Sequence, residues 1–308
     1  MRRFLSALLC AVLLLGLLPS AFAAPGIITA KCSVDKTTAF VGDTITWNVY
    51  DVNGSGFYSY AYMVYRNGSS EPYLPDYSWH ADENSRSYKP PESGTYHPQV
   101  WIMDHYILNP YIFEGPATVV SLRPAPKITK VEAVSGTSLK ITWKEVPGAS
   151  GYFLERSTGK TTGYKQVNAT TAVSFTDTSL KAGTRYYYRV RAYNLVDGVK
   201  VVSGKFSAAA AGVPLTKAAL TKVSSVSANQ IKLTWEKAAG ATGYEVFRSS
   251  SKTGTYTAVR KINALSMIVT GMEPGNTYYF KVRAYKKINT ATYYGPMSGY
   301  RSGRTIAE

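Results

Sequence analysis

Apolar and polar residues alternate along much of the chain, with the period of two that is typical of half-buried β-strands. The alternation is clearest at residues 139–143 and 231–235, where leucine, isoleucine and tryptophan are separated by lysine and threonine. Turn residues such as Pro147-Gly148 and Gly163 divide these segments into short strands. No long stretch repeats apolar residues at helical spacing. The pattern therefore predicts an all-β protein built from β-sandwich modules.

The last two portions of the chain are a repeat, because a shift of 92 residues lays one on the other without a gap. The shift pairs Trp143 with Trp235, Gly183 with Gly275, and residues 190–193 with residues 282–285, both Val-Arg-Ala-Tyr. This period is too long for most solenoid repeats and indicates a duplicated whole domain. We predict two sandwich domains, at residues 126–213 and 216–305.

Three motifs recur in each repeat: a tryptophan on the second strand, a Gly-Tyr pair that opens the third, and a tyrosine-containing corner before the sixth. They are Trp143, Gly151-Tyr152 and residues 180–186 (LKAGTRY) in the first repeat, and Trp235, Gly243-Tyr244 and residues 272–278 (MEPGNTY) in the second. This set resembles the fibronectin type III family, although Ala182 replaces the usual proline. The resemblance implies that the corner tyrosine bonds to backbone a few residues upstream. It also implies a sandwich fold and an extracellular setting, but no particular ligand.

Residues 24–122 do not follow the repeat, yet they also read as a sandwich. Residues 44–49 alternate in polarity, and every second residue of 58–62 is tyrosine. Residues 93–96 (SGTY), followed by alternating apolar positions up to Asp104, resemble bacterial PKD-like and immunoglobulin-like modules. We therefore predict three sandwich modules in a row, the first of them PKD-like or Ig-like and joined to the second by a short, stiff, proline-rich linker.

The chain begins like a secretory signal peptide over residues 1–23. Two arginines precede an apolar stretch at residues 4–18, and the small residues of 21–23 form a cleavage site. A transmembrane helix needs about 20 apolar residues, and neither this stretch nor any later one reaches that length. We expect a chain cut after Ala23, without a transmembrane segment, that is secreted or non-covalently associated with the cell surface.

Cysteine chemistry is not expected in the exported chain. Cys10 is removed with the signal peptide, which leaves Cys32 without an internal disulfide partner. Cys32 lies at an apolar position of an alternating segment, so we assign it to the core of a first strand.

Catalytic and metal sites also find little support in the sequence. All three histidines, His80, His97 and His105, lie in the first module, at spacings unlike those of metal ligands. The repeats therefore lack a histidine-based triad. Residues 51–56 resemble the start of a calcium loop, but Tyr62 stands where the loop requires a glutamate. We expect no cofactor and no metal.

Charge is divided unequally along the chain. Residues 25–122 carry 5 Lys or Arg against 10 Asp or Glu, whereas residues 123–308 carry 28 against 9. The excess positive charge of residues 123–308 attracts polyanions. For an exported protein these are anionic cell-wall polymers or polysaccharides. No nucleic-acid motif occurs, and other extracellular proteins are alternative partners. The alternative explanation is that the lysines only keep strand edges soluble.

The sixth strand of each repeat is the candidate binding surface. The family resemblance places alternate residues of 186–192 in the core, so the intervening side chains face outward. The predicted ligand-binding residues are Tyr187, Arg189, Arg191, Tyr193, Tyr279, Lys281, Arg283 and Tyr285. Aromatic residues beside cations could stack on sugar rings and meet anionic groups. Alternatively, Glu155 and Glu245 on the adjacent strand pair with the cations, which makes the row of side chains cross-strand stabilisation.

These observations favour a non-catalytic extracellular binding or spacer protein of a bacterium, with basic modules that contact cell-envelope polymers. Two alternatives remain open. One is a structural accessory subunit of an extracellular enzyme complex. The other is a hydrolase with its site in the first module, where His97 and His105 would be required.

Overall fold

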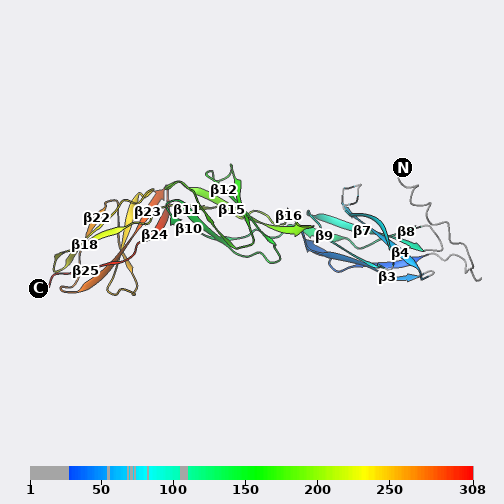
Figure 1. Cartoon of the computed structure of the whole chain (residues 1–308), viewed down its shortest axis with the longest axis horizontal. Helices are drawn as coiled ribbons and strands as arrows, with labels where there is room; N and C mark the ends of the chain where they lie inside the picture. Colours follow the sequence, from blue (N-terminus) through cyan, green and yellow to red (C-terminus); the bar gives the residue numbers. More distant parts are fainter. Residues whose placement is uncertain are drawn as a thin grey trace, which may run out of the picture. The chain divides into compact units, whose positions relative to one another are not determined.

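The computed structural model describes residues 28–53, 56–67, 69, 72, 74–81, 83–104 and 110–307. The predicted signal peptide lies outside this part of the chain. Within it, every regular element is a β-strand (Figure 1). No helix there is long and apolar enough to cross a membrane. The prediction of an all-β sandwich protein is therefore confirmed.

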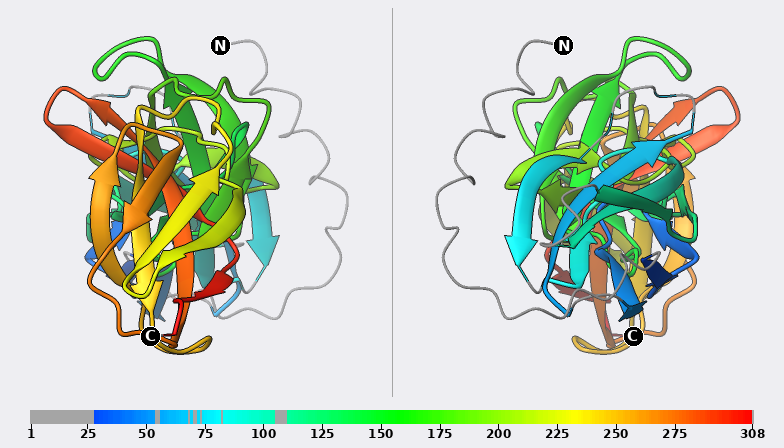
Figure 2. Two further views of the ribbon diagram at one scale, coloured as in Figure 1. Left: turned by 90° about the vertical axis from the view of Figure 1, so that its left-hand side faces the viewer. Right: turned by 90° about the vertical axis from the view of Figure 1, so that its right-hand side faces the viewer.

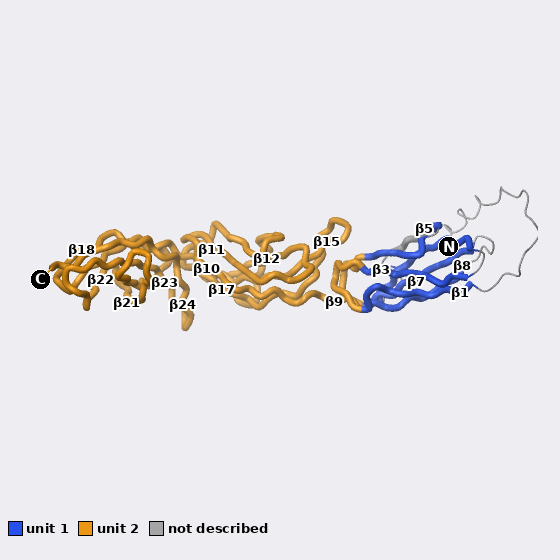
Figure 3. The backbone as a smooth tube through the Cα atoms, turned by 90° about the horizontal axis from the view of Figure 1, so that it is seen from below, with its two compact units in different colours: residues 1–37, 45–88, 95–118 blue, residues 38–44, 89–94, 119–308 orange. Residues whose placement is uncertain are grey.

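The chain forms two compact units (Figure 3). The first comprises residues 1–37, 45–88 and 95–118, and the second comprises residues 38–44, 89–94 and 119–308. Both repeats thus lie in the second unit. The boundaries predicted for three separate modules stay a prediction.

The first unit contains two groups of paired strands. One is ordered β1-β3-β6, and in the other β7, β4 and β5 pair in that order while β8 also pairs with β7. The strands are β1 (Thr29–Val34), β3 (Ile45–Asn53), β4 (Tyr58–Arg66), β5 (Leu74–Ala81), β6 (Ser85–Tyr88), β7 (Gly94–Asp104) and β8 (Pro110–Glu114). Trp47 and Tyr62 are fully buried between them. Cys32 lies on β1 as predicted, half-buried against this core, and burial raises the pKa of its thiol.

The second unit begins with β2 (Thr38–Phe40), which pairs in parallel with β9 (Thr118–Ser121). Each repeat that follows has a three-stranded and a five-stranded sheet. The first repeat has the orders β10-β11-β14 and β13-β12-β15-β16, with β17 on β15; the second has β18-β19-β22 and β21-β20-β23-β24, with β25 on β23. The left view of Figure 2 shows the strands of the second repeat most clearly, coloured yellow to red.

The strand bounds of the two repeats show the same succession. In the first repeat they are β10 (Ile128–Ser135), β11 (Ser138–Trp143), β12 (Gly151–Ser157), β13 (Lys165–Thr170), β14 (Ser174–Asp177), β15 (Tyr186–Val196), β16 (Val199–Val202) and β17 (Ala210–Gly212). In the second they are β18 (Leu220–Ser227), β19 (Gln230–Trp235), β20 (Gly243–Ser249), β21 (Thr257–Ile262), β22 (Ser266–Val269), β23 (Thr277–Ile288), β24 (Ala291–Met297) and β25 (Arg301–Arg304).

The repeats share one offset until near their ends. Tyr193 pairs with Val202 and Tyr285 pairs with Tyr294, which keeps the offset of 92 residues. Further along, the amide of Val190 donates to Ser207, whereas the equivalent amide of Val282 donates to Ser298. The offset from Ser207 to Ser298 is 91. The gap-free alignment was therefore wrong in its last segment, where the second repeat is one residue shorter.

The predicted cores and corners of both repeats are present. Trp143 and Trp235 are each 2% exposed, and each belongs to the core cluster of its repeat. At the corners, the backbone N–H of Lys181 donates to the hydroxyl of Tyr186 over 3.1 Å, and the N–H of Glu273 donates to Tyr278 over 2.9 Å. Each tyrosine thus bonds to backbone five residues upstream, as the family resemblance implies.

A second tyrosine in each repeat gives a test of the core. The hydroxyl of Tyr152 accepts the buried backbone N–H of Val146 over 2.8 Å, and Tyr244 accepts that of Ala238 over the same distance. Replacing Tyr152 by phenylalanine leaves a buried donor unsatisfied, so we expect a loss of about 1–3 kcal/mol of unfolding free energy. Urea denaturation measures it. Tyr164→Phe removes a hydroxyl from an exposed hydrogen bond and is the control; equal losses in the two variants would contradict the argument.

The linker residue Arg123 is buried within the second unit. Its side chain is 5% exposed and forms an ion pair with Asp43. It also donates to the carbonyl of Pro147 over 2.8 Å and to the side chain of Asn194 over 3.2 Å. A buried guanidinium with this many acceptors holds the backbone around it in one arrangement.

Candidate functional site

The predicted ligand-binding residues lie on β15 and β23, on the sheet face opposite the core. Residues Tyr186, Tyr188, Val190 and Ala192 belong to the core cluster, as the alternation predicted. Of the intervening residues of β15, the two tyrosines are nevertheless buried, since Tyr187 is 8% and Tyr193 3% exposed, whereas Arg189 and Arg191 are half-buried. The side chains point away from the core, as the alternation predicted, although the two tyrosines are not open to solvent.

Aromatic side chains from neighbouring segments cover the cations of the first repeat. The guanidinium of Arg189 lies 4.2 Å from the ring centre of Tyr164 and 3.8 Å from that of Phe206. Arg191 lies 4.3 Å from the same Phe206 ring. Stacking of this kind favours a guanidinium that is partly removed from water. The row of side chains is thus a packed layer on the outer sheet face.

Glu155 of β12 pairs with both cations. It stands directly opposite Arg189 in the β12–β15 register. The Nε of Arg189 donates to the Glu155 carboxylate over 2.8 Å, and a guanidinium nitrogen of Arg191 lies 3.9 Å from that carboxylate. This is the cross-strand arrangement that the structural alternative predicted. Binding by these residues stays a prediction.

The second repeat has the same pairing of cations with a glutamate and aromatic rings, but its tyrosines are more exposed. Arg283 donates to Glu245 over 2.8 Å and lies 3.9 Å from the ring centre of Tyr294. Lys281 lies 4.0 Å above the Tyr256 ring. Tyr279, Lys281, Arg283 and Tyr285 are all half-buried rather than buried. Of the two repeats, the second therefore offers more aromatic surface to a ligand, while the cations are half-buried in both.

The pairing with Glu155 predicts a cost for removing Arg189. Arg189→Gln leaves the Glu155 carboxylate, whose side chain is only 12% exposed, without its main partner. We expect a loss of about 1–3 kcal/mol of unfolding free energy, measured by chemical denaturation. The double variant with Glu155→Gln restores neutrality and should recover part of the loss. If Arg189→Gln unfolds like the wild type, the pair is not structural.

A buried polar network in the first repeat is structural. Arg156 donates twice to Asp177, over 2.9 and 3.0 Å, and the hydroxyl of Tyr188 donates to the same carboxylate over 2.8 Å. Burial, together with this carboxylate, raises the pKa of Tyr188. The second repeat places Val269 and Phe280 where the first has Asp177 and Tyr188. The fold therefore forms without this network.

The histidines and the calcium-like segment of the first module lie only partly within the described residues. His97 shares a 2.6 Å hydrogen bond with Asn67, whereas His105 and the side chain of His80 lie outside the described part. In the calcium-like segment, Asp51 pairs with Lys31 over 2.7 Å, and Tyr62, at the twelfth position, is buried and donates to the carbonyl of Glu83. Among the described residues no three His, Cys, Asp or Glu side chains are grouped to hold a metal ion.

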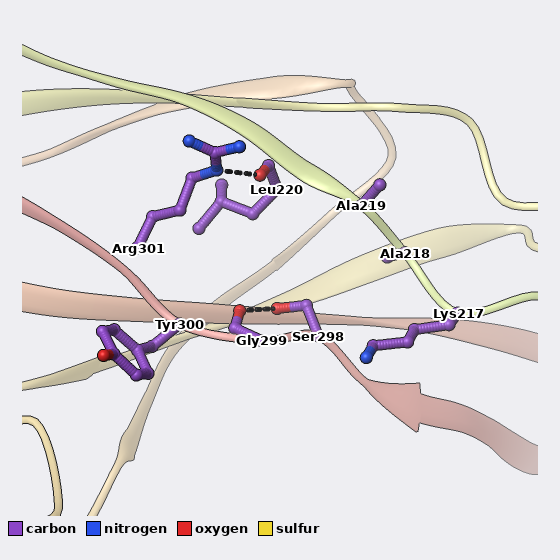
Figure 4. A pocket seen from close by; sticks show the side chains of 8 residues that line it. All are labelled: Lys217, Ala218, Ala219, Leu220, Ser298, Gly299, Tyr300 and Arg301. Atoms are coloured by element: carbon purple, nitrogen blue, oxygen red, sulfur yellow. Dashed lines mark hydrogen bonds between the residues drawn. The ribbon is translucent and has the colours of Figure 1, made fainter.

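A pocket of about 240 Å³ lies in the second repeat; none of the predicted residues lines it, but Tyr279 packs against its lining residue Tyr300. Its lining includes Lys217, Leu220, Ser298, Gly299, Tyr300 and Arg301. Figure 4 shows the side chains of Tyr300 and Arg301 on one side of the pocket and that of Lys217 on the other. None of these three was predicted. A comparison of the two repeats could have revealed these residues, because the first repeat has Ala125, Ala209 and Ala210 at the equivalent positions.

Both repeats match a known family, and part of the chain is similar to known enzymes. The family model described as "Fibronectin type III domain" matches residues 124–200 and 218–298. Exoglucanase B of Cellulomonas fimi is 30% identical over 183 residues, which are 52% of this chain and 15% of that protein. Poly(3-hydroxybutyrate) depolymerase of Ralstonia pickettii is 32% identical over 130 residues, 42% of this chain and 24% of that protein. The chain thus spans a quarter or less of the length of these relatives.

A solved structure is similar at lower identity. The FN1–FN3 domains of chicken CNTN1 match 90% of this chain and 97% of their own length, at 15% identity and a TM-score of 0.32.

Proposed function

Because the chain belongs to the fibronectin type III domain family, we propose that it is an exported, non-catalytic binding and spacer protein whose basic repeats contact anionic cell-envelope polymers or polysaccharides. The excess of positive charge carries this proposal. Residues 123–308 hold 28 Lys or Arg and 9 Asp or Glu, and Glu155, Asp177 and Glu245 are already paired within the repeats. Most cations therefore have no carboxylate of their own repeat available and can meet anions in solution.

Export is part of the same proposal. It is supported by the signal-peptide pattern of residues 1–23, and the family also occurs in the polymer-degrading enzymes that this chain resembles over part of their length. A non-catalytic role is supported by the confinement of all three histidines to the first module. A hydrolase assay with His97→Ala as the comparison tests this role: hydrolysis that the substitution abolishes would overturn it.

The binding role is tested by retention of the exported chain, residues 24–308, on immobilised polyglycerol phosphate and on polygalacturonate. We expect retention at about 0.05 M salt and release at about 1 M, where the screening length falls to about 3 Å. The control is an uncharged dextran resin. Absence of retention at low salt, or retention that salt does not weaken, would contradict binding through charge.

A second function is favoured by the similarity to Exoglucanase B and to the depolymerase. The chain would then be an accessory subunit that spaces or positions a separate polymer-degrading enzyme. Recovery of such an enzyme with the tagged chain, at a salt concentration that releases it from anionic resin, would distinguish this role from direct polymer binding.

A further inference from the structure

The pocket of the second repeat combines an exposed aromatic ring with two cations. Tyr300 is 40% exposed. Arg301 follows it at the start of β25, and Lys217 comes from the segment that enters β18. The volume of about 240 Å³ is below the 300–1,000 Å³ of most small-molecule sites. It therefore suits one unit of an extended ligand.

Neighbouring side chains hold the Tyr300 ring in place. The ring of Tyr279 meets it edge-on with the centroids 5.7 Å apart. The ammonium of Lys252 lies 5.5 Å from the Tyr300 centroid, and its hydrogen bond to the Tyr300 hydroxyl raises the pKa of this lysine. A ring fixed by two partners loses little freedom when a ligand stacks on it.

The two cations of the pocket, Arg301 and Lys217, differ in their surroundings. Arg301 donates its Nε to the backbone carbonyl of Leu220, as Figure 4 shows. That bond orients the guanidinium and leaves its two terminal nitrogens as donors. Lys217 is exposed. The oriented guanidinium of Arg301 suits a carboxylate, and the ammonium of Lys217 adds a second positive charge on the other side of the pocket.

We propose that this pocket binds one acidic sugar unit of an anionic polysaccharide. The C–H face of the sugar lies against the Tyr300 ring, and its carboxylate accepts from the terminal nitrogens of Arg301, with Lys217 adding positive charge on the other side of the pocket. The proposal rests on the proposed polymer-binding function and narrows it to a uronic acid, because a polymer without rings has nothing to stack on Tyr300. It assigns the site to the second repeat, since the first has alanine in place of Lys217, Tyr300 and Arg301.

The test uses the exported chain, residues 24–308, and trigalacturonate as the probe in calorimetric titrations. The variant Tyr300→Ala/Arg301→Ala carries the residues of the first repeat, so its fold is expected to survive, which circular dichroism checks. We expect its affinity for trigalacturonate to fall about tenfold or more. The control Lys140→Gln/Lys205→Gln removes two exposed positive charges from the first repeat and should keep the affinity within about twofold of wild type.

Two further measurements separate the outcomes. If the wild type is retained on polyglycerol phosphate but does not bind trigalacturonate, the pocket assignment is overturned while the proposed function stands. Retention on neither anionic resin overturns the proposed function itself. An equal fall in affinity in the alanine variant and in the lysine control shows diffuse attraction and also overturns the pocket. Maltotriose, a neutral trisaccharide, should bind at least about tenfold more weakly than trigalacturonate, and equal affinity would exclude the role of the cations.

Discussion

Replacing Trp143 by alanine is expected to remove about 3–5 kcal/mol of unfolding free energy, as the loss of a large core aromatic does. The ring is 2% exposed, sits in the core cluster of the first repeat and meets Tyr152 edge-on with centroids 5.6 Å apart. The alanine would leave a cavity that the two sheets cannot close. Urea denaturation followed by circular dichroism measures the loss, and Trp235→Ala should give a loss of the same size, because it has the same burial and a Tyr244 neighbour at 5.6 Å.

A phenylalanine at position 143 separates the contribution of ring packing from that of hydrogen bonding by the indole N–H. The indole N–H of Trp143 is buried and has no hydrogen-bond partner among the described residues. Trp143→Phe therefore loses no hydrogen bond and keeps most of the ring volume, so its cost should be well below that of alanine, at about 1–2 kcal/mol. The packing argument is contradicted if the phenylalanine and alanine variants are equally unstable, or if both unfold like the wild type.

The sequence was most informative where one pattern repeats along a strand. The alternation at residues 139–143 and 231–235 correctly predicted β11, β19 and their buried tryptophans. The corner motifs predicted the bonds of Tyr186 and Tyr278 to backbone five residues upstream. Both features depend on residues close together in the chain, so the sequence order carries the necessary information.

Contacts between distant segments could not be predicted in the same way. Alternation assigned Arg189 to the outer face of its strand, but not the cover that Tyr164 and Phe206 provide. That cover depends on how far long side chains reach from neighbouring segments. The pocket likewise needs both Lys217 and Tyr300, two residues from opposite ends of the second repeat. Only a fold in which the first and last strands approach each other brings them together.

Glycines at equivalent corners of the two repeats should differ in their tolerance of alanine. Gly183 and Gly275 have φ of +74° and +66°, a conformation that costs an L-residue about 1–2 kcal/mol. They differ in their surroundings. A Cβ on Gly183 would lie 2.8 Å from the Cα of Gly240, which belongs to the second repeat, whereas a Cβ on Gly275 would find its nearest neighbour, Ala307, at 3.8 Å. The first distance is a clash with backbone, and the second is ordinary contact.

Gly275→Ala is therefore expected to lose about 1–2 kcal/mol of unfolding free energy from backbone strain alone. Gly183→Ala should lose about 1–3 kcal/mol more, because the clash forces the two repeats apart at a junction where Leu215 is fully buried. Urea denaturation of residues 24–308 measures both losses under the same conditions. The additional loss in Gly183→Ala measures the contact between the repeats, because both variants carry the same backbone strain at φ. Equal losses would mean that the corner of the first repeat does not support the second.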